Sequence, residues 1–486
     1  MITISNRIIF FLFTVLFSIA AGFFAYWQNT YYLIIPFIFL MGILLVGHPQ
    51  YLVYGLAISI PWSIEYHFDG NFSTDLPDEP LMLLSSVAVL SLLIFHQRRT
   101  KWKSIHPLIF ILVLEFLWII ITVITSTDFI VSLKYGLAKS WYLLAFVALP
   151  LLLFQDEKIL KRSAVLLLCS MLFFMFIALA RHSQYLWTFE KVNDALRPFF
   201  LNHVNYSALL VFMVPLQIAV LQINSSKKSK TFLSGLLVLT ITALYLSYSR
   251  GSWLALLTGI SAYWLLKKRI LFIGFVLFIS VSIGIVFWLK TNDRFLEYSN
   301  DYKTTIFHSN FSEHLIATYK LKDLSNAERF YRWVAGVRMV KDTWQTGTGP
   351  STFYHQYKSY TLPAFKTYVS ANTEQSTVHN YFLLVLIEQG VIGFLLFIGL
   401  VACFFWYAQK IYHRTKEKFW KVTVAAIASI MIMQCTVNFL SDMIETDKIG
   451  SVFYLCIAVL IIADFKTRNE SNFPTNVQGI PQAIPQ

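Results

Sequence analysis

The sequence contains little charge. Only 13% of its 486 residues are Asp, Glu, Lys or Arg, whereas 57% are apolar and 17% aromatic. This composition excludes a soluble domain and indicates many membrane-spanning helices. The net charge of +13 would suggest nucleic acid as a partner of a soluble protein, but basic residues also crowd the cytoplasmic loops of membrane proteins. No basic face with interleaved aromatic residues lies outside the apolar segments, so we expect no nucleic-acid partner.

Cysteine and the common catalytic motifs are also scarce. All four cysteines lie inside apolar segments, and no Cys/His spacing of a metal site occurs. This argues against a disulfide framework and a bound metal. A glycine-rich nucleotide loop, a nucleophile elbow, an HEXXH-type helix and an Asp-x-Asp pair are absent as well. We therefore expect no metal and no other cofactor.

Long apolar stretches dominate the chain and predict an all-α integral membrane protein with 12–14 transmembrane helices. Stretches 31–47, 50–65 and 252–266 are shorter than the ~20 residues of a usual span, so they are expected to be tilted, broken or re-entrant. Fourteen stretches are found, at 8–27, 31–47, 50–65, 80–96, 105–125, 135–154, 163–180, 204–223, 231–248, 252–266, 270–289, 380–408, 420–440 and 449–465.

Basic clusters fix the expected orientation. With the N-terminus inside, one alternating frame places all of them in the cytosol, as the positive-inside rule requires; the clusters are at 98–103, 158–162, 227–230, 267–269, 410–421 and 466–468. Both termini are then cytoplasmic. The segments predicted outside are 66–79, 126–134, 181–203, 249–251, 290–378 and 441–448.

The frame divides the chain into four parts: an N-terminal transmembrane bundle (1–289), a large outer loop (290–378), C-terminal transmembrane helices (379–465) and a polar tail expected to be disordered (466–486). In the loop, Ala327–Trp344 predicts an amphipathic helix that we expect to lie on the membrane as a lid. Its expected apolar face is Tyr331, Val334, Val337 and Val340. The acidic segment 441–448 is expected to be a solvated loop.

Arg250 lies between two apolar runs, where charge is costly and usually has a task. Ser249 and Gly251 flank it, and the N–H groups of the following helix start would support an anion such as a phosphate. The alternative is an arginine that extends to the lipid headgroups.

His379 and Asn380 open a later apolar run on the same predicted side. A histidine can accept a proton at neutral pH, and Asn380 can orient a ligand or cap the helix. Glu388 lies deeper in that run and needs a partner on another helix, which the sequence does not identify. Arg329, Arg332 and Arg197 are further candidates for anion contact, although a solvated helix face is the simpler interpretation for Arg329 and Arg332.

Four motifs follow one another between residues 200 and 400. They are Phe200-Leu201-Asn202-His203-Val204-Asn205-Tyr206; Ser247-Tyr248-Ser249-Arg250-Gly251-Ser252-Trp253; Glu328-Arg329-Phe330-Tyr331-Arg332-Trp333 with Gly347-Thr348-Gly349-Pro350; and His379-Asn380-Tyr381 with Glu388-Gln389-Gly390. In this order around one large loop, they resemble the O-antigen ligase and O-antigen polymerase family of bacterial envelope glycosyltransferases.

The resemblance implies a GT-C-like fold in the bacterial inner membrane with a periplasmic active site. It also implies transfer of a glycan from an undecaprenyl-diphosphate-linked donor to an acceptor hydroxyl. Arg250 and Arg329, with Arg197 and Arg332 as further contacts, would bind the diphosphate, and His379 would activate the acceptor. Ser249, Gly251, Asn380 and Glu388 would support them.

Several functions remain open at this point. The acceptor can be the lipid A-core, which makes the protein an O-antigen ligase, or a growing repeat-unit chain or a protein side chain. We favour the ligase because the third and fourth motifs resemble that branch most. A polysaccharide transporter would show more charge at mid-helix than Glu115, Lys139 and Glu388.

Overall fold

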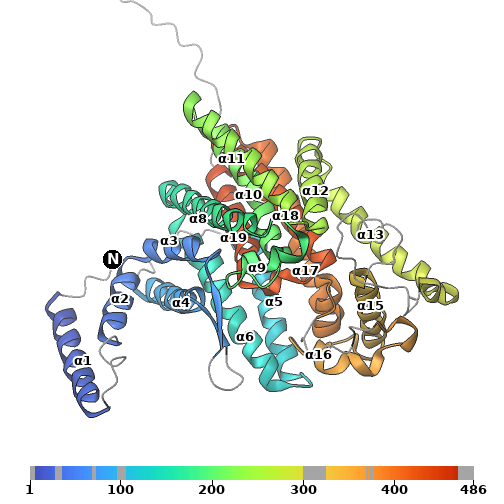
Figure 1. Cartoon of the computed structure of the whole chain (residues 1–486), viewed down its shortest axis with the longest axis horizontal. Helices are drawn as coiled ribbons and strands as arrows, with labels where there is room; N and C mark the ends of the chain where they lie inside the picture. The colour runs from blue at the N-terminus through green and yellow to red at the C-terminus, as the bar shows by residue number, and fades with distance from the viewer. Residues whose placement is uncertain are drawn as a thin grey trace, which may run out of the picture.

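The computed structural model describes residues 6–27, 35–67, 73–95, 105–298, 324–367, 370 and 377–468, and it is an all-α bundle, as predicted (Figure 1). Each of the fourteen apolar stretches contains a helix. The main helices are α1 (Asn6–Trp27), α2 (Ile35–Gly47), α3 (Pro49–Ser59), α4 (Asp78–Phe95), α5 (Pro107–Ile124), α6 (Phe129–Leu143), α7 (Leu149–Leu153), α8 (Glu157–Ser183), α10 (His203–Ile223), α11 (Lys227–Leu246), α12 (Arg250–Lys267), α13 (Leu271–Lys290), α17 (Tyr381–Arg414), α18 (Lys418–Leu440) and α19 (Asp447–Arg468).

Short elements connect these helices. A π-helical turn (Leu144–Ala148) joins α6 to α7, and two antiparallel strands, β1 (Ile64–His67) and β2 (Ser73–Leu76), pair with Ile64 opposite Leu76. The outer segments contain α9 (Val192–Leu196), α15 (Leu324–Thr343), α16 (Phe353–Gln356) and the 3₁₀ turns Phe189–Lys191, Thr291–Tyr298, Tyr357–Tyr360, Pro363–Phe365 and Met443–Glu445.

Nine helical segments in the described ranges are long and apolar enough to cross a membrane, and a bent pair made of α2 and α3 is a tenth. The described residues thus contain fewer such segments than the 12–14 predicted for the whole chain. The two members of the bent pair meet at 111°, because Pro49 at the start of α3 cannot continue the hydrogen bonding of α2. Stretches 31–47 and 50–65, which were each expected to be tilted, broken or re-entrant, thus meet at a sharp bend.

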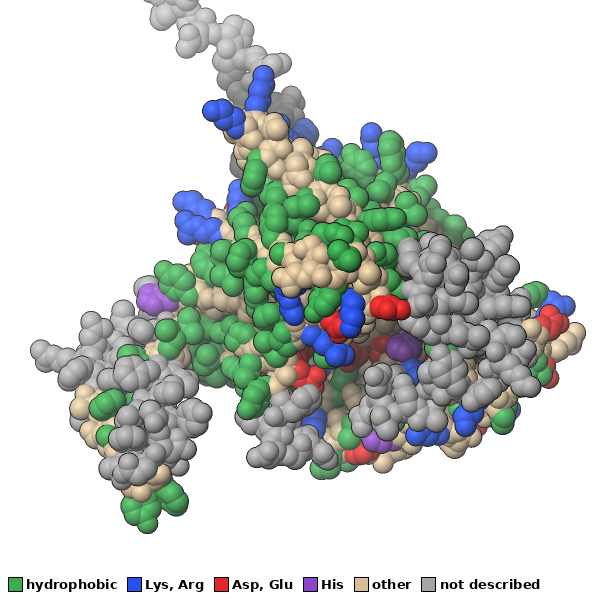
Figure 2. Space-filling model, in the orientation of Figure 1, with side chains coloured by type: hydrophobic (Ala, Val, Ile, Leu, Met, Phe, Trp, Pro, Cys, Tyr) green, Lys and Arg blue, Asp and Glu red, His purple; other side chains and the backbone are tan. Residues whose placement is uncertain are grey.

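The centre of the bundle is formed by α19, α10 and α18. In α19, 83% of the apolar window is buried, against 17% in α11 and 11% in α13. Helices with so many exposed apolar side chains are stable only where lipid covers them. Figure 2 shows this broad apolar surface, with Lys and Arg side chains gathered along its upper edge at the ends of α11 and α12.

Polar contacts inside the bundle hold α12 in place. Ser252 shares hydrogen bonds with Ser207 of α10 at 2.7 Å and with Ser249 at 3.1 Å. Further along, Thr258 meets Thr436 of α18 at 2.8 Å. Hydroxyl pairs of this kind join neighbouring helices where no water competes. They fix the start of α12, and therefore the position of Arg250.

The predicted loop helix forms, as α15, but it buries a different face. Its buried residues are Ala327, Glu328, Tyr331, Arg332, Ala335, Gly336 and Met339, while Val337 is 38% exposed. A spacing of three drifts around a helix of 3.6 residues per turn, so Val337 leaves the face on which Tyr331 lies. The expected grouping of Arg332 on a solvated face is thus wrong.

The C-terminal tail begins slightly later than predicted. Helix α19 continues to Arg468, and the rest of the expected disordered tail, residues 469–486, lies outside the described residues. Parts of the outer loop, residues 299–323, 368–369 and 371–376, lie outside them as well.

Candidate active site

The Arg329 side chain and the start of α12, where Arg250 lies, both meet the C-terminal end of α18. The Nε atom of Arg329 donates a hydrogen bond to the carbonyl oxygen of Leu440 at 3.1 Å. Leu440 Cδ1 also lies 3.5 Å from the position that a Cβ at Gly251 would take. The start of α12, with Arg250 at its first position, and α15 therefore meet at one helix end. Ser249 is buried beneath them.

Arg332 contacts His379 directly. Its Nη1 donates to His379 Nε2 at 2.8 Å and to the carbonyl oxygen of Thr377 at 3.2 Å. Because a guanidinium can only donate, Nε2 is the accepting nitrogen, and the ring proton of the neutral imidazole lies on Nδ1. Nδ1 in turn lies 3.7 Å from the Asp442 carboxylate. The imidazole is thus held between a cation and an anion.

Further hydrogen bonds and an ion pair hold both ends of the Arg332–His379–Asp442 series of contacts. Arg332 is 3% exposed and pairs with Glu328 at 3.3 Å, whose carboxylate accepts hydrogen bonds from Thr367 and Ser370. At the other end, Thr377 donates to Asp442. A charge at this depth persists only with such partners. The arrangement is therefore preorganised by α15, α17 and the turn after α18.

The backbone around His379 directs its side chain. His379 has a left-handed conformation (φ 54°), which turns the chain into α17. Asn380 then caps the helix, because its side chain accepts from the Leu383 N–H at 3.0 Å. The next residue, Tyr381, donates its backbone N–H to Ser441 at 2.9 Å. The histidine is thereby fixed beside the turn that contains Asp442.

Glu388 binds the end of the outer loop and not the other candidate residues. Its two side-chain oxygens accept hydrogen bonds from the backbone N–H groups of Ser351, at 2.9 Å, and Phe353, at 3.1 Å. These donors belong to the end of the outer loop, and 5% of Glu388 is exposed. The partner that the sequence did not identify is therefore a pair of backbone amides, and the contact fastens the loop to α17.

A break in α17 completes this fastening. The helix is interrupted at Gly390 (φ 68°), and the carbonyl groups just before the break accept hydrogen bonds from other elements. The backbone N–H groups of Thr348 and Gly349 donate to the carbonyl oxygens of Ile387 and Glu388. The indole N–H of Trp118 donates to the carbonyl oxygen of Gln389. Broken backbone inside a membrane protein requires such replacement partners. A Cβ at Gly347 would lie 2.3 Å from the Glu388 backbone, so only glycine allows this close approach.

One predicted residue lies apart from the site, and one residue that was not predicted belongs to it. Arg197 lies exposed at the end of α9, where its carbonyl oxygen accepts from Arg181 at 2.6 Å, apart from the contacts that join Arg329, Arg332 and His379. Asp442, in contrast, was not predicted as a site residue, yet it faces His379. Its position on the predicted outer side, directly after an apolar run, was the available signal.

The segment 441–448 is also less solvated than expected. Met443 and Ile444 are buried, and Glu445 accepts a hydrogen bond from Tyr135 at 3.2 Å. Glu445 as a whole residue is exposed, but partial desolvation of its carboxylate raises its pKa, with the nearby Lys139 opposing the shift. Met443 and Ile444 pack against α18 and α19, whereas Asp442 and Asp447 are half-buried and Glu445 is exposed, so the expectation of a solvated loop is wrong for the apolar pair only.

Acidic, basic and histidine side chains gather around a recess between α9 and α16 in Figure 2. Among the described residues, no group of three or more His, Cys, Asp or Glu side chains has the arrangement of a metal site. The chemistry available there is that of guanidinium groups, one imidazole and one carboxylate.

Comparison with known proteins agrees with this geometry. Residues 235–398, about a third of the chain, match a family model described as O-antigen ligase. This region of the chain is therefore similar to the O-antigen ligase family. A search among curated proteins gives no match. The O-antigen ligase domain contains every predicted site residue except Arg197, and it ends before Asp442. The span-length apolar helices describe a multi-pass membrane protein, and the match makes residues 235–398 similar to the enzymes of the O-antigen ligase family.

Proposed function

We propose that this protein transfers a glycan from undecaprenyl diphosphate to an acceptor hydroxyl on the periplasmic side of the bacterial inner membrane, as an O-antigen ligase acting on the lipid A-core. The observation that carries the proposal is the convergence of the α12 start and Arg329 on the end of α18, next to the Arg332–His379–Asp442 chain. The O-antigen ligase family match supports it.

Arg250 and Arg329 would bind the diphosphate. When the bond between the anomeric carbon and the diphosphate oxygen breaks, its electron pair stays on the diphosphate, and guanidinium groups stabilise that charge best in a partly desolvated site. Guanidinium stays charged at any physiological pH, so the proposed reaction requires no divalent metal. Attack from the side opposite the leaving group inverts the anomeric carbon.

Arg332 and His379 would act in sequence. In this structure Nε2 of His379 is occupied by Arg332, so the base is blocked. A bound phosphate competes for the Arg332 guanidinium, since a doubly charged acceptor binds it more strongly than a neutral nitrogen. Nε2 is then available to take the proton of the acceptor hydroxyl as its oxygen bonds to the anomeric carbon. Asp442 faces the Nδ1 proton and supports the imidazolium that forms.

The isoprenoid tail needs an apolar groove that begins near Arg250. A hollow of about 280 Å³ lies between α10, α12 and α18, and it is lined by Pro215, Ile218, Leu256, Gly259, Ile260 and Met433, among others. Leu256 is only six residues from Arg250, so the groove continues from the diphosphate site along α12. We assign the tail to this groove.

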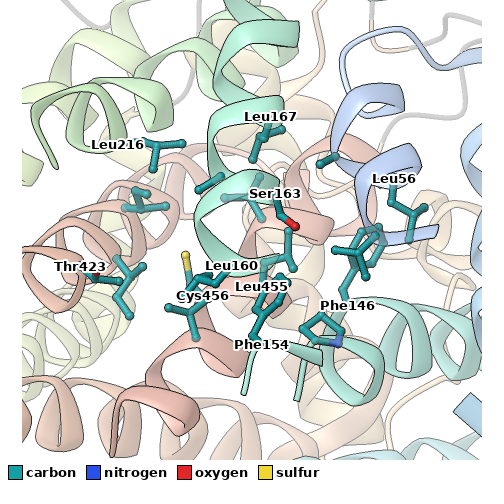
Figure 3. Close-up of a pocket in the computed structure, with 18 of the residues that line it drawn as sticks. Leu56, Phe146, Phe154, Leu160, Ser163, Leu167, Leu216, Thr423, Leu455 and Cys456 are labelled. Atoms are coloured by element: carbon teal, nitrogen blue, oxygen red, sulfur yellow. The ribbon is translucent and has the colours of Figure 1, made fainter. Parts of the chain in front are cut away.

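A second apolar cavity is less suitable. It has a volume of about 120 Å³ and is lined by α3, the α6–α8 region, α10, α18 and α19 (Figure 3). Its residues on α10, Met213 and Leu216, lie on a different face of that helix from Pro215 and Ile218. The body of α10 and α18 thus separates this cavity from the start of α12.

Reconstitution of the full chain with a synthetic undecaprenyl-diphosphate glycan tests the proposal. Lipid A-core, a second donor molecule and an acceptor protein are supplied in separate reactions, with and without EDTA. We expect transfer to lipid A-core that persists in EDTA and is abolished by His379→Ala and by Arg250→Ala. Lys341→Ala, an exposed change on α15, serves as the control and should leave transfer intact.

Each other outcome has a defined meaning. Elongation of the donor identifies a polymerase, and labelling of the acceptor protein identifies a protein glycosyltransferase. Full transfer by His379→Ala would remove the proposed base. Inhibition by EDTA that added Mg²⁺ reverses would contradict the metal-independent mechanism.

A further inference from the structure

A second polar hollow lies far from the candidate active site, at the opposite end of α17. Its volume is about 350 Å³, and it is formed by the turn between α12 and α13 and by the last turns of α17; the lining residues are Arg269, Trp406, Gln409, Lys410, His413 and Arg414. His379 directly precedes the 34-residue helix α17, which is broken at Gly390, and the hollow lies beside the last turns of this helix.

The lining of this hollow is strongly cationic. Arg269, Lys410 and Arg414 contribute three positive charges, and no acidic side chain is among the lining residues. The nearest carboxylate partner is Asp464, which pairs with Arg414 at 2.9 Å but also with Arg468. Asp464 is fully buried and therefore does not face the hollow. Asp464 partly compensates Arg414, so the positive potential of the hollow comes mainly from Arg269 and Lys410 and is available to an anion from outside the chain.

Hydrogen bonds to the backbone preform the walls. His413 Nε2 donates to the carbonyl oxygen of Leu266 at 2.9 Å, and Gln409 Oε1 accepts from the Leu271 N–H at 3.0 Å. These contacts fasten α17 to the end of α12 and the start of α13. Because the side chains are already ordered, an anion that binds there immobilises few further groups.

Exposed tryptophans indicate the depth of the hollow in the membrane. Trp406 belongs to the lining and is 52% exposed. Trp264, near the end of α12, is 55% exposed, and Lys267 lies 5.8 Å from the centre of its ring. Tryptophan next to lysine is typical of the headgroup level of a bilayer. The cations therefore lie where phospholipid phosphates are.

We propose that this hollow binds the phosphate of an anionic phospholipid. The three cations supply the charge, Gln409 supplies amide N–H donors, and Trp406 packs beside the upper acyl chains. Basic pockets between transmembrane helices at the headgroup level are suited to such lipids. This site is independent of the glycosyltransferase chemistry, and its test requires no glycan transfer.

Native mass spectrometry of the purified full chain tests the site. The detergent-solubilised protein is titrated with dioleoylphosphatidylglycerol, dioleoylphosphatidylcholine or inorganic phosphate. We expect tight retention of phosphatidylglycerol, much weaker retention of phosphatidylcholine and no competition by millimolar phosphate. Each cation near a lipid headgroup is worth roughly fivefold in binding, so Arg269→Gln with Lys410→Gln should weaken phosphatidylglycerol binding on the order of 25-fold.

The matched control removes the same charge outside the hollow. Lys268→Gln with Lys418→Gln changes two exposed lysines that do not line it, and phosphatidylglycerol retention should stay as in the wild type. Equal loss in both double variants, or equal retention of the two phospholipids, would overturn the proposal. Displacement by inorganic phosphate would overturn the lipid assignment in favour of a soluble anion. Should the lining variant not purify, the single change Lys410→Glu, at an exposed position, replaces it and should abolish preferential retention.

Discussion

Replacing Glu388 with glutamine separates a structural role of this side chain from a chemical one. The two oxygens of Glu388 accept hydrogen bonds from the backbone N–H groups of Ser351 and Phe353, at 2.9 and 3.1 Å. Glutamine has nearly the same shape, but it offers one oxygen and one NH₂ group. One of the two backbone N–H groups must then face another donor, and Glu388 is too deeply buried for water to replace the lost acceptor.

The expected effect is a local loosening of the loop. A buried donor without an acceptor costs about 1–3 kcal/mol, which corresponds to a roughly 5- to 140-fold increase in the local opening equilibrium. Hydrogen exchange mass spectrometry of the purified full chain should show this acceleration in peptides covering residues 347–356. Peptides from α10 and α19 should exchange as in the wild type, because they lie in the centre of the bundle.

A matched variant and the transfer assay complete the experiment. Glu417→Gln removes a carboxylate at the exposed start of α18 and should leave exchange in 347–356 unchanged. Glycan transfer by Glu388→Gln should fall but remain measurable, in contrast to His379→Ala. Wild-type exchange together with complete loss of transfer would refute the reasoning and place Glu388 in the chemistry.

Two further predictions concern the turn after α18. Asp442→Asn removes the charge that faces His379 Nδ1 at 3.7 Å and should lower kcat by roughly 100-fold with a smaller change in KM; steady-state kinetics with an unchanged kcat would contradict this role. Partial desolvation of its carboxylate raises the pKa of Glu445 above its usual value of 4.5, so its contribution to stability is present at low pH and is lost as the pH rises through the raised value. Glu445→Gln should therefore flatten the decline in thermal stability as the pH rises above 4.5, and an identical slope in both proteins would argue against it.

Apolar runs predicted the helices well, because burial in lipid imposes a strong pattern on composition. The face of α15 was predicted less well. Val337 matched a regular spacing of valines but is exposed, whereas Arg332 is buried through its contacts with Glu328 and His379. Those partners come from the same helix and from a segment more than 40 residues away, and no local pattern reveals the second contact.

The residues of the candidate site were likewise predicted only in part. His379 was predicted from residue type at a membrane edge, and Arg329 from the motif that resembles the O-antigen ligase family; in the structure Arg329 contacts the end of α18 and His379 contacts Arg332. Glu388 was predicted as a supporting residue, but its loop partners could not be identified. They are backbone N–H groups, which almost every residue carries, so residue types do not show which of them bind Glu388. Asp442 was missed because an acidic turn resembles a solvated loop until its packing against distant helices is known.

The hydroxyl contacts along α12 have a consequence for substrate choice. Through Ser252 and Thr258, α12 is joined to α10 and α18, and Arg329 is held by the last carbonyl of that same α18. Arg329 belongs to the outer loop, but its hydrogen bond to Leu440 ties it to the body that carries Arg250, so the spacing of the two cations is fixed while that bond is kept. A fixed spacing between the two cations selects the carrier by the length of its anionic group. A diphosphate can span both positive groups, whereas a carrier with a single phosphate reaches one of them at a time.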